Sequence, residues 1–154
     1  GDWRLRVYSS SLRPYVDNSY DLGASSVRFD DVYATNGTIQ TSDARDKADV
    51  TELDRGLDFV NALSPVSYRR SDRSGYEGSR IHWGLLAQDV AEVLGDDAAN
   101  SAVWVHTAAG EETDVEGETY ETPDRQGIRY EELIAPMVKA IQELSTRVTN
   151  LEAA

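Results

Sequence analysis

A serine and a lysine that could form a hydrolytic pair stand close together in the chain, at Ser42 and Lys47. A serine hydroxyl becomes a nucleophile when a base takes its proton, and a lysine amine can act as that base when burial lowers its pKa. Such pairs cleave bonds without a cysteine, metal or cofactor. The Thr41–Ser42 peptide bond lies beside the attacking hydroxyl and is the predicted substrate. The same spacing also fits a solvated loop that performs no chemistry.

The composition narrows the chemistry available to the chain. Its 154 residues fit about one domain, and its net charge of −13 argues against binding to a phosphate backbone. With no cysteine, thiolate chemistry is excluded, and two histidines make a histidine-rich metal centre improbable. No apolar run approaches the ~18 residues of a membrane span. We therefore expect no cofactor, metal, nucleic acid or membrane partner.

Residues 1–41 differ in character from the rest of the chain. An alternating strand pattern at Trp3–Tyr8 is followed by closely spaced turn residues and short apolar pieces. A segment of this kind cannot bury a face alone, because an isolated hairpin is only marginally stable in water. It therefore needs a larger sheet or further copies of itself.

The pattern becomes helical after Asp49. Apolar residues recur at helical intervals from Val50 to Val60, and residues 51–54 resemble a capping box. We expect a helix here that is weakened by Gly56 and ends before Pro65.

Strands and a second helix are expected beyond Pro65. Trp83 and Trp104 lie in strand-like runs, which predicts that both belong to the core. The acidic residues 108–126 form a segment long for a structureless loop, which predicts a projecting arm, a hairpin or a mobile segment. The expected elements are strands at residues 66–68, 81–86 and 101–107, and a helix through Val90, Val93 and Leu94.

The last 25 residues carry the clearest periodicity. Six apolar residues alternate at spacings of three and four, as the a and d positions of a coiled coil do. The pattern predicts self-association through this seam, although a helix packed on its own domain remains the alternative. Pro136 is tolerable because it falls near the expected start of the helix. The seam consists of Ile134, Met137, Ile141, Leu144, Val148 and Leu151.

The segment around the serine and lysine resembles the opening motif of a known family. Ser42-Asp43-x-Arg45-x-Lys47, followed by Val50, is similar to the S-D-x-R-x-K-x-x-[IV] motif of the intramolecular chaperone domain of phage tail spikes and fibres (peptidase family S74, endosialidase type). Four further blocks resemble this family in the same order. They are residues 21–39, the L-x-P-V-x-Y pattern at 63–68, the H-x-G-x-x-A-Q-x-V pattern at 82–90, and residues 130–144.

The resemblance implies an α+β fold class with two domains. Residues 1–41 would be a β stub that ends a triple β-helix, the stalk of the fibre. Residues 42–154 would form the mixed helix and strand chaperone domain, with a projecting arm and a long C-terminal helix at about 131–153. In a homotrimer, three copies of that helix would form a coiled coil.

The resemblance also implies a function and a set of site residues. The domain would bring three chains of a viral tail fibre or spike into register and then release itself by serine autoproteolysis between Thr41 and Ser42. Ser42 would be the nucleophile and Lys47 the general base of a single-turnover, self-cleaving endopeptidase. The partners implied are two further copies of the chain and the upstream fibre domain of the same polypeptide. His82, Asp43 and Gln88 are the candidate assisting residues.

The location implied is a virion tail fibre or spike precursor that folds in the host cytoplasm, with the released domain absent from the mature virion.

One residue departs from the family pattern. Asp46 stands where relatives usually have an apolar residue, and a carboxylate beside Lys47 would favour its charged form. Cleavage could thus be slow, unless Asp46 points to solvent. A non-cleaving trimerisation cap, or a receptor-binding fibre tip, remains the alternative function.

Overall fold

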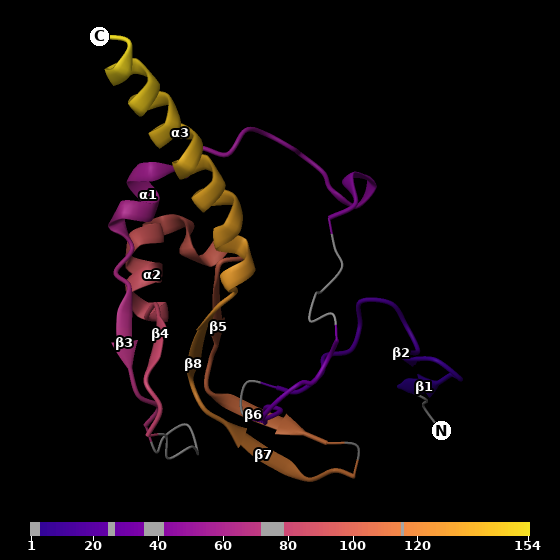
Figure 1. Ribbon diagram of the computed structural model, residues 1–154. Helices are drawn as coiled ribbons and strands as arrows, with labels where there is room; N and C mark the ends of the chain where they lie inside the picture. The colour runs from indigo at the N-terminus through magenta and orange to yellow at the C-terminus, as the bar shows by residue number, and fades with distance from the viewer. Residues whose placement is uncertain (1–3, 25–26, 36–41, 72–78, 115) are drawn as a thin grey trace. The chain divides into compact units, whose positions relative to one another are not determined.

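The computed structural model describes residues 4–24, 27–35, 42–71, 79–114 and 116–154 (Figure 1). The chain divides into two compact units: Gly1–Ile39 with Ala109–Pro123, and Gln40–Ala108 with Asp124–Ala154. Within the described residues the strands form four two-stranded sheets, and the longest element is a C-terminal helix. The expectation of a mixed helix and strand fold is confirmed. The domain boundary after residue 41 stays a prediction.

The first unit contains two small hairpins. Strands β1 (Leu5–Val7) and β2 (Leu12–Pro14) pair antiparallel, with Val7 opposite Leu12, and both are exposed. The predicted strand near the N-terminus is therefore present. In the acidic segment, β6 (Gly110–Thr113) pairs antiparallel with β7 (Thr119–Thr122), which confirms the hairpin among the three alternatives.

Helix α1 of the second unit is shorter than predicted. It covers Leu57–Ala62, whereas residues 51–55 are not helical. Gly56 is its N-cap and supplies no side chain, so the Leu57 N–H donates instead to Glu143 Oε2 at 2.8 Å. A Cβ at Gly56 would overlap the Glu143 carboxylate. The predicted capping box is wrong, because a residue distant in sequence caps the helix.

The second unit also contains two antiparallel strand pairs and a second helix. The strand at residues 66–68 and the helix through residues 90–94 are confirmed, and the expected strand at 101–107 is formed by its last four residues. The elements are β3 (Val66–Tyr68) paired with β4 (His82–Gly84), β5 (Trp104–Thr107) paired with β8 (Arg125–Ile128), and α2 (Ala87–Leu94), followed by the 3-10 helix η3 (Gly95–Asn100).

The prediction that Trp83 is a core residue is wrong in the single chain. Trp83 is 87% exposed, and Ile81, two residues before it, is 60% exposed. Successive side chains of a strand point to opposite faces, so one face of β4 is left uncovered while His82 and Gly84 are partly buried on the other. Trp104 is partly buried and packs against the core, as expected.

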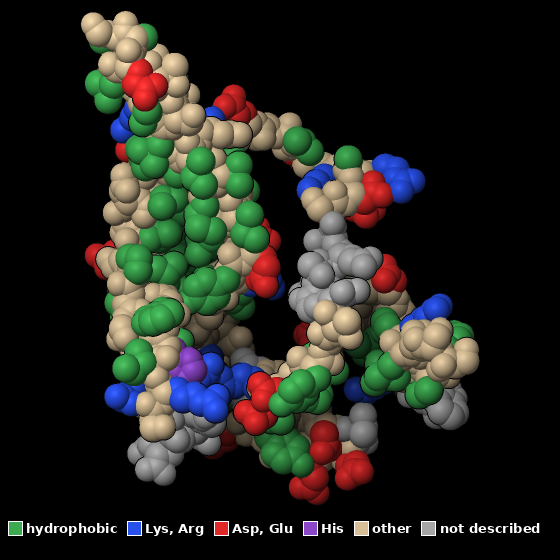
Figure 2. Space-filling model, viewed as in Figure 1, with side chains coloured by type: hydrophobic (Ala, Val, Ile, Leu, Met, Phe, Trp, Pro, Cys, Tyr) green, Lys and Arg blue, Asp and Glu red, His purple; other side chains and the backbone are tan. Residues whose placement is uncertain are grey.

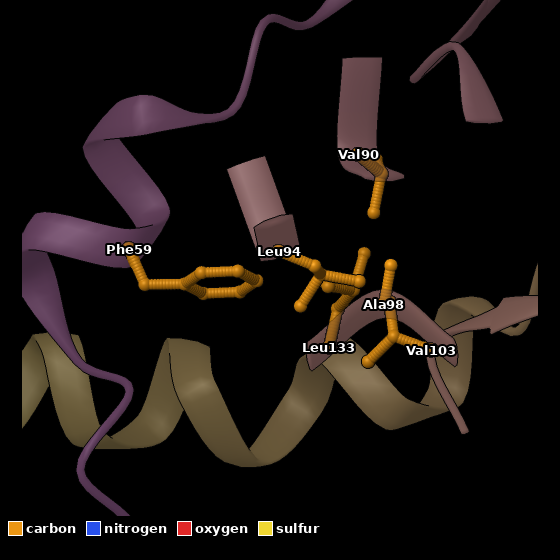
Figure 3. Close-up of a cluster of buried hydrophobic side chains, with 6 residues drawn as sticks. All are labelled: Phe59, Val90, Leu94, Ala98, Val103 and Leu133. Carbon is orange, nitrogen blue, oxygen red and sulfur yellow. The ribbon is translucent and has the colours of Figure 1, made fainter. Parts of the chain in front are cut away.

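Six side chains form the buried core of the second unit (Figure 3). They come from α1, α2, η3, the residue before β5, and a short 3-10 helix, η4 (Tyr130–Leu133). None of them precedes residue 57, so the core contains no part of the Ser42–Lys47 segment. The core residues are Phe59, Val90, Leu94, Ala98, Val103 and Leu133.

Helix α3 (Ile134–Glu152) directly follows η4 and is the long C-terminal helix that the sequence predicts (Figure 1). Pro136 is its third residue, where a missing N–H breaks no helical hydrogen bond. Pro136 and Ala140 are its buried residues and α1 packs against it. Coiled-coil assembly and the triple β-helix remain proposals.

Candidate functional site

The Ser42–Lys47 segment folds around a single 3-10 turn. The turn, η1, covers Ala44–Asp46, with Asp43 as its N-cap and Lys47 as its C-cap. This turn shortens the path between the two residues that flank it. Lys47 Nζ donates a hydrogen bond to Ser42 Oγ at 2.7 Å, so the two predicted reacting groups are in direct contact.

Asp43 and Arg45 stabilise this turn. The Asp43 carboxylate accepts the backbone N–H of Arg45 at 2.9 Å and its guanidinium at 3.0 Å from Nε and 2.5 Å from Nη2. These contacts with Arg45 hold the pKa of Asp43 below its usual value. The carboxylate is therefore charged near neutral pH and satisfies one of the free N–H groups at the start of the turn.

The backbone of Ser42 has an unusual conformation. Its φ is 94°, a region that residues with a Cβ rarely adopt. Such conformations cluster at functional sites, where the surroundings hold them in place. Residues 42–50 are exposed in the single chain, so water reaches the pair freely. Thr41, on the other side of the predicted cleavage bond, lies outside the described residues.

Asp46 does not pair with Lys47. The carboxylate and the amine are neighbours in sequence, but the ion pairs found in the described part of the chain include none between them. Asp46 is exposed on the turn. The structure therefore favours the second alternative left open by the sequence, in which this carboxylate points to solvent.

The other two candidate assisting residues lie elsewhere in the second unit. His82 is on β4, its ring stacks on Tyr68 with centroids 5.5 Å apart, and its Nε2 is buried without a partner in the described residues. Gln88 is exposed on α2. Among the described residues no hydrogen bond joins either side chain to Ser42 or Lys47, so their assisting roles stay predictions.

The predicted seam is the exposed face of α3. Figure 2 shows hydrophobic side chains gathered along this helix. Their exposed fractions run from 44% at Met137 to 77% at Leu151, whereas Pro136 and Ala140 on another face are buried. The seam is therefore not what packs α3 on its own domain. Exposed apolar stripes of this kind are typical of association surfaces, and the predicted self-association stays a prediction.

Two glutamates tie the residues between the turn η1 and helix α1 to α3. Glu52, in the segment between η1 and α1, accepts a hydrogen bond from Lys139 Nζ at 2.6 Å. Glu143 caps α1, as described above. Both contacts join positions more than 80 residues apart, and no local pattern could reveal such pairs.

The described residues contain no group of three or more His, Cys, Asp or Glu side chains that could hold a metal ion. None of their helices is long and apolar enough to cross a membrane.

Residues 42–98 match the model of the Peptidase S74 family, described as the chaperone of endosialidase. The matched segment begins at Ser42 and includes η1, α1, β3, β4 and α2. The resemblance predicted from the motifs is thus confirmed for residues 42–98, which are similar to the chaperone of endosialidase. The family name refers to a peptidase activity, and the match does not identify the residues or the mechanism of cleavage.

The chain is also similar to parts of long phage proteins. It is 36% identical over 90 residues to the side tail fiber protein pb1 of Escherichia phage T5, covering 56% of the chain and 6% of that protein. It is 28% identical over 153 residues to the long tail fiber protein Gp37 of Enterobacteria phage T2, covering 99% of the chain and 10% of that protein. The chain therefore spans a tenth or less of the length of these relatives.

A depolymerase specific for capsule K3, from Klebsiella phage KP32, is 28% identical over 106 residues, with 61% of the chain and 12% of that protein covered. Among solved structures, the crystal structure of "a novel intramolecular chaperon" is 25% identical and aligns with a TM-score of 0.42 over 73% of this chain and all of that chain.

Proposed function

We propose that the chain is the C-terminal part of a phage tail fibre or spike, in which an intramolecular chaperone domain trimerises, registers the stalk and then cuts itself off. The tail fibre relatives support this context, since the similarity to the Gp37 protein extends over 99% of the chain. The observation that carries the cleavage step is the 2.7 Å contact between Lys47 Nζ and Ser42 Oγ.

In the proposed reaction, the uncharged Lys47 amine takes the proton of Ser42 Oγ, which attacks the carbonyl carbon of Thr41. The Thr41–Ser42 amide bond breaks as its nitrogen leaves with the proton returned by Lys47, which leaves an ester between the Thr41 carbonyl and Ser42 Oγ. Water then hydrolyses the ester to give a carboxylate at Thr41 and a free amine and hydroxyl at Ser42. The unusual φ of Ser42 supports the choice of this bond.

The proposed trigger is assembly. In the single chain the Lys47 amine contacts the serine hydroxyl in a segment that is open to water. Three chains associated through the α3 seam would surround the site with protein and reduce its contact with water. Cleavage would then follow trimer formation, which is the order that a chaperone of fibre assembly needs.

The physical benefit concerns the register of the stalk. Strands in turn-rich segments specify their pairing weakly, and a domain that trimerises first raises the effective concentration of the three strands. Removal of the domain afterwards blocks the reverse path kinetically. On this proposal residues 1–41 end a triple β-helix that stays in the virion, whereas the released domain, folded in the host cytoplasm, does not.

The intact mass and N-terminal sequence of the freshly expressed chain test the proposal. We expect two fragments split before Ser42 from the wild type, and one uncut chain from Ser42→Ala and from Lys47→Ala. Lys47→Ala cleaved at the wild-type rate would refute the Ser–Lys assignment. A wild-type chain that stays whole as a trimer would instead favour the trimerisation cap that remains attached.

A mixture of Ser42→Ala and Lys47→Ala chains, refolded together, tests how the pair is shared. Recovered cleavage would indicate that Lys47 of one subunit acts on Ser42 of another. The contact within one chain leads us to expect no recovery.

A further inference from the structure

We propose that Asp43 and Arg45 form a clasp that positions Lys47 for the reaction, so that both are positioning residues of the self-cleavage site. This inference rests on the proposed function. Neither side chain touches the reacting atoms: their contacts are with each other and with the backbone of the turn.

The first step of the argument is that nothing buried stabilises this turn. Residues 44–46 include no buried residue, and the core begins only at Phe59. Two long backbone hydrogen bonds close η1, from Asp46 N at 3.2 Å and from Lys47 N at 3.3 Å. A turn this short and exposed is not stable by itself. The position of Lys47 must therefore depend on side-chain contacts within the turn.

The second step is the geometry of those contacts. One Asp43 oxygen accepts both the backbone N–H and the Nε of Arg45, and the other accepts Nη2 at 2.5 Å. Arginine presents two parallel donors that match a carboxylate, which fixes orientation as well as distance. The clasp thus fixes the backbone conformation between Ser42 and Lys47. Because Lys47 is the C-cap of this turn, its side chain leaves the backbone in a fixed direction.

The third step is electrostatic. An uncompensated Asp43 carboxylate next to Ser42 would favour the charged form of the Lys47 amine, which cannot accept a proton. The Arg45 guanidinium pairs with that carboxylate and offsets its field. The other charged side chains near Lys47 along the segment are Asp46 and Asp49, both exposed and without an ion pair in the described residues.

Self-cleavage rates of the 154-residue chain, followed by mass spectrometry across pH, test the clasp. We expect Arg45→Ala to slow cleavage by about 10- to 100-fold, as misplacement of a reacting group does. It should also raise the pH at which cleavage reaches half of its maximal rate (the pH midpoint), because the unpaired Asp43 carboxylate would favour the charged form of the Lys47 amine. Arg45→Lys should restore part of the rate, since an ammonium supplies the charge without the fork. Asp49→Asn, which removes an unpaired carboxylate nearby, is the matched control.

A double-mutant cycle sharpens the test. If the two residues act as one unit, Asp43→Ala with Arg45→Ala is no slower than the slower single variant, and its midpoint does not move upwards. Strictly additive losses would overturn the clasp. So would an Arg45→Ala chain that cleaves at the wild-type rate with an unchanged midpoint.

A readout without cleavage separates failure of the clasp from failure of the proposed function. In the uncleavable Ser42→Ala chain, the carbon chemical shifts of Ala44 and Asp46 should be those of a turn, and should move to random-coil values when Arg45→Ala is added. Unchanged shifts overturn the clasp whether or not the wild type cleaves. Turn shifts that depend on Arg45 in a chain that never cleaves would support the clasp and refute the proposed function.

Discussion

Two faces of α3 differ in the residue types that they carry and in whether they contact the rest of the chain. The face towards its own domain carries small, polar and charged residues: Pro136 and Ala140 are buried, while Lys139 and Glu143 contact Glu52 and the start of α1. The seam face carries six apolar side chains, each at least 44% exposed. A helix packed only on its own domain would show the reverse pattern.

The comparison separates the face of α3 that packs on its own domain from the face that is left exposed. The contacts of α3 with its own domain include buried Ala140 and the Glu143 carboxylate at the N-terminus of α1. The apolar seam residues take no part in that packing, and on the proposed function they contact other copies of the chain. We therefore expect substitutions on the two faces to separate folding from assembly.

The largest effect is expected from a charge on the seam. Ile141→Asp replaces an a-position side chain that trimerisation would bury, and losing that burial weakens association by roughly 1.5–3 kcal/mol per chain. Sedimentation equilibrium should show a monomer and self-cleavage should stop, whereas the circular dichroism spectrum should stay close to that of the wild type. Thr146→Asp, which adds the same charge to an exposed position outside the seam, should leave the trimer intact. A trimer that survives Ile141→Asp would contradict the assigned seam.

An intermediate effect is expected on the packed face. Glu143→Ala leaves the Leu57 N–H without its acceptor, which should lower the free energy of unfolding by about 1 kcal/mol, the usual loss for a helix cap. Urea denaturation should be measured in the Ile141→Asp background, so that association does not add to stability.

Glu143→Gln provides the matched comparison, because its amide oxygen can still accept the Leu57 N–H. We expect it to lose less stability than Glu143→Ala. Equal losses in the two variants would show that the carboxylate charge, and not the capping hydrogen bond, stabilises the helix start. Neither variant should change the oligomeric state of a chain that has the wild-type seam.

Features that depend on residues close together in the sequence could be predicted, whereas features that depend on distant residues could not. The contact of Ser42 with Lys47 and the helix that displays the seam depend on residues within one turn or one helix, and their spacing was visible in the sequence. The start of α1 was predicted too early because its cap, Glu143, is 86 positions away. The exposure of Trp83 was missed because a strand pattern does not tell how many of its faces are covered.

The smallest effect is expected from the Glu52–Lys139 contact. The hydrogen bond with Lys139 lowers the pKa of Glu52 below 4.5 and raises that of Lys139 above 10.5. The stabilisation is therefore complete between about pH 5 and 10, fades as pH falls through the lowered pKa of Glu52, and fades as pH rises through the raised pKa of Lys139.

Lys139→Met should consequently lower the urea midpoint slightly, by less than Glu143→Ala does, because exposed ion pairs contribute little. The difference from the wild type should shrink as pH falls through the lowered pKa of Glu52. Glu52→Gln should reproduce the loss at pH 7 without adding to it in the double variant. A difference that does not change as Glu52 becomes protonated would mean that packing of the Lys139 stem, and not its charge, holds the segment after the turn on the helix.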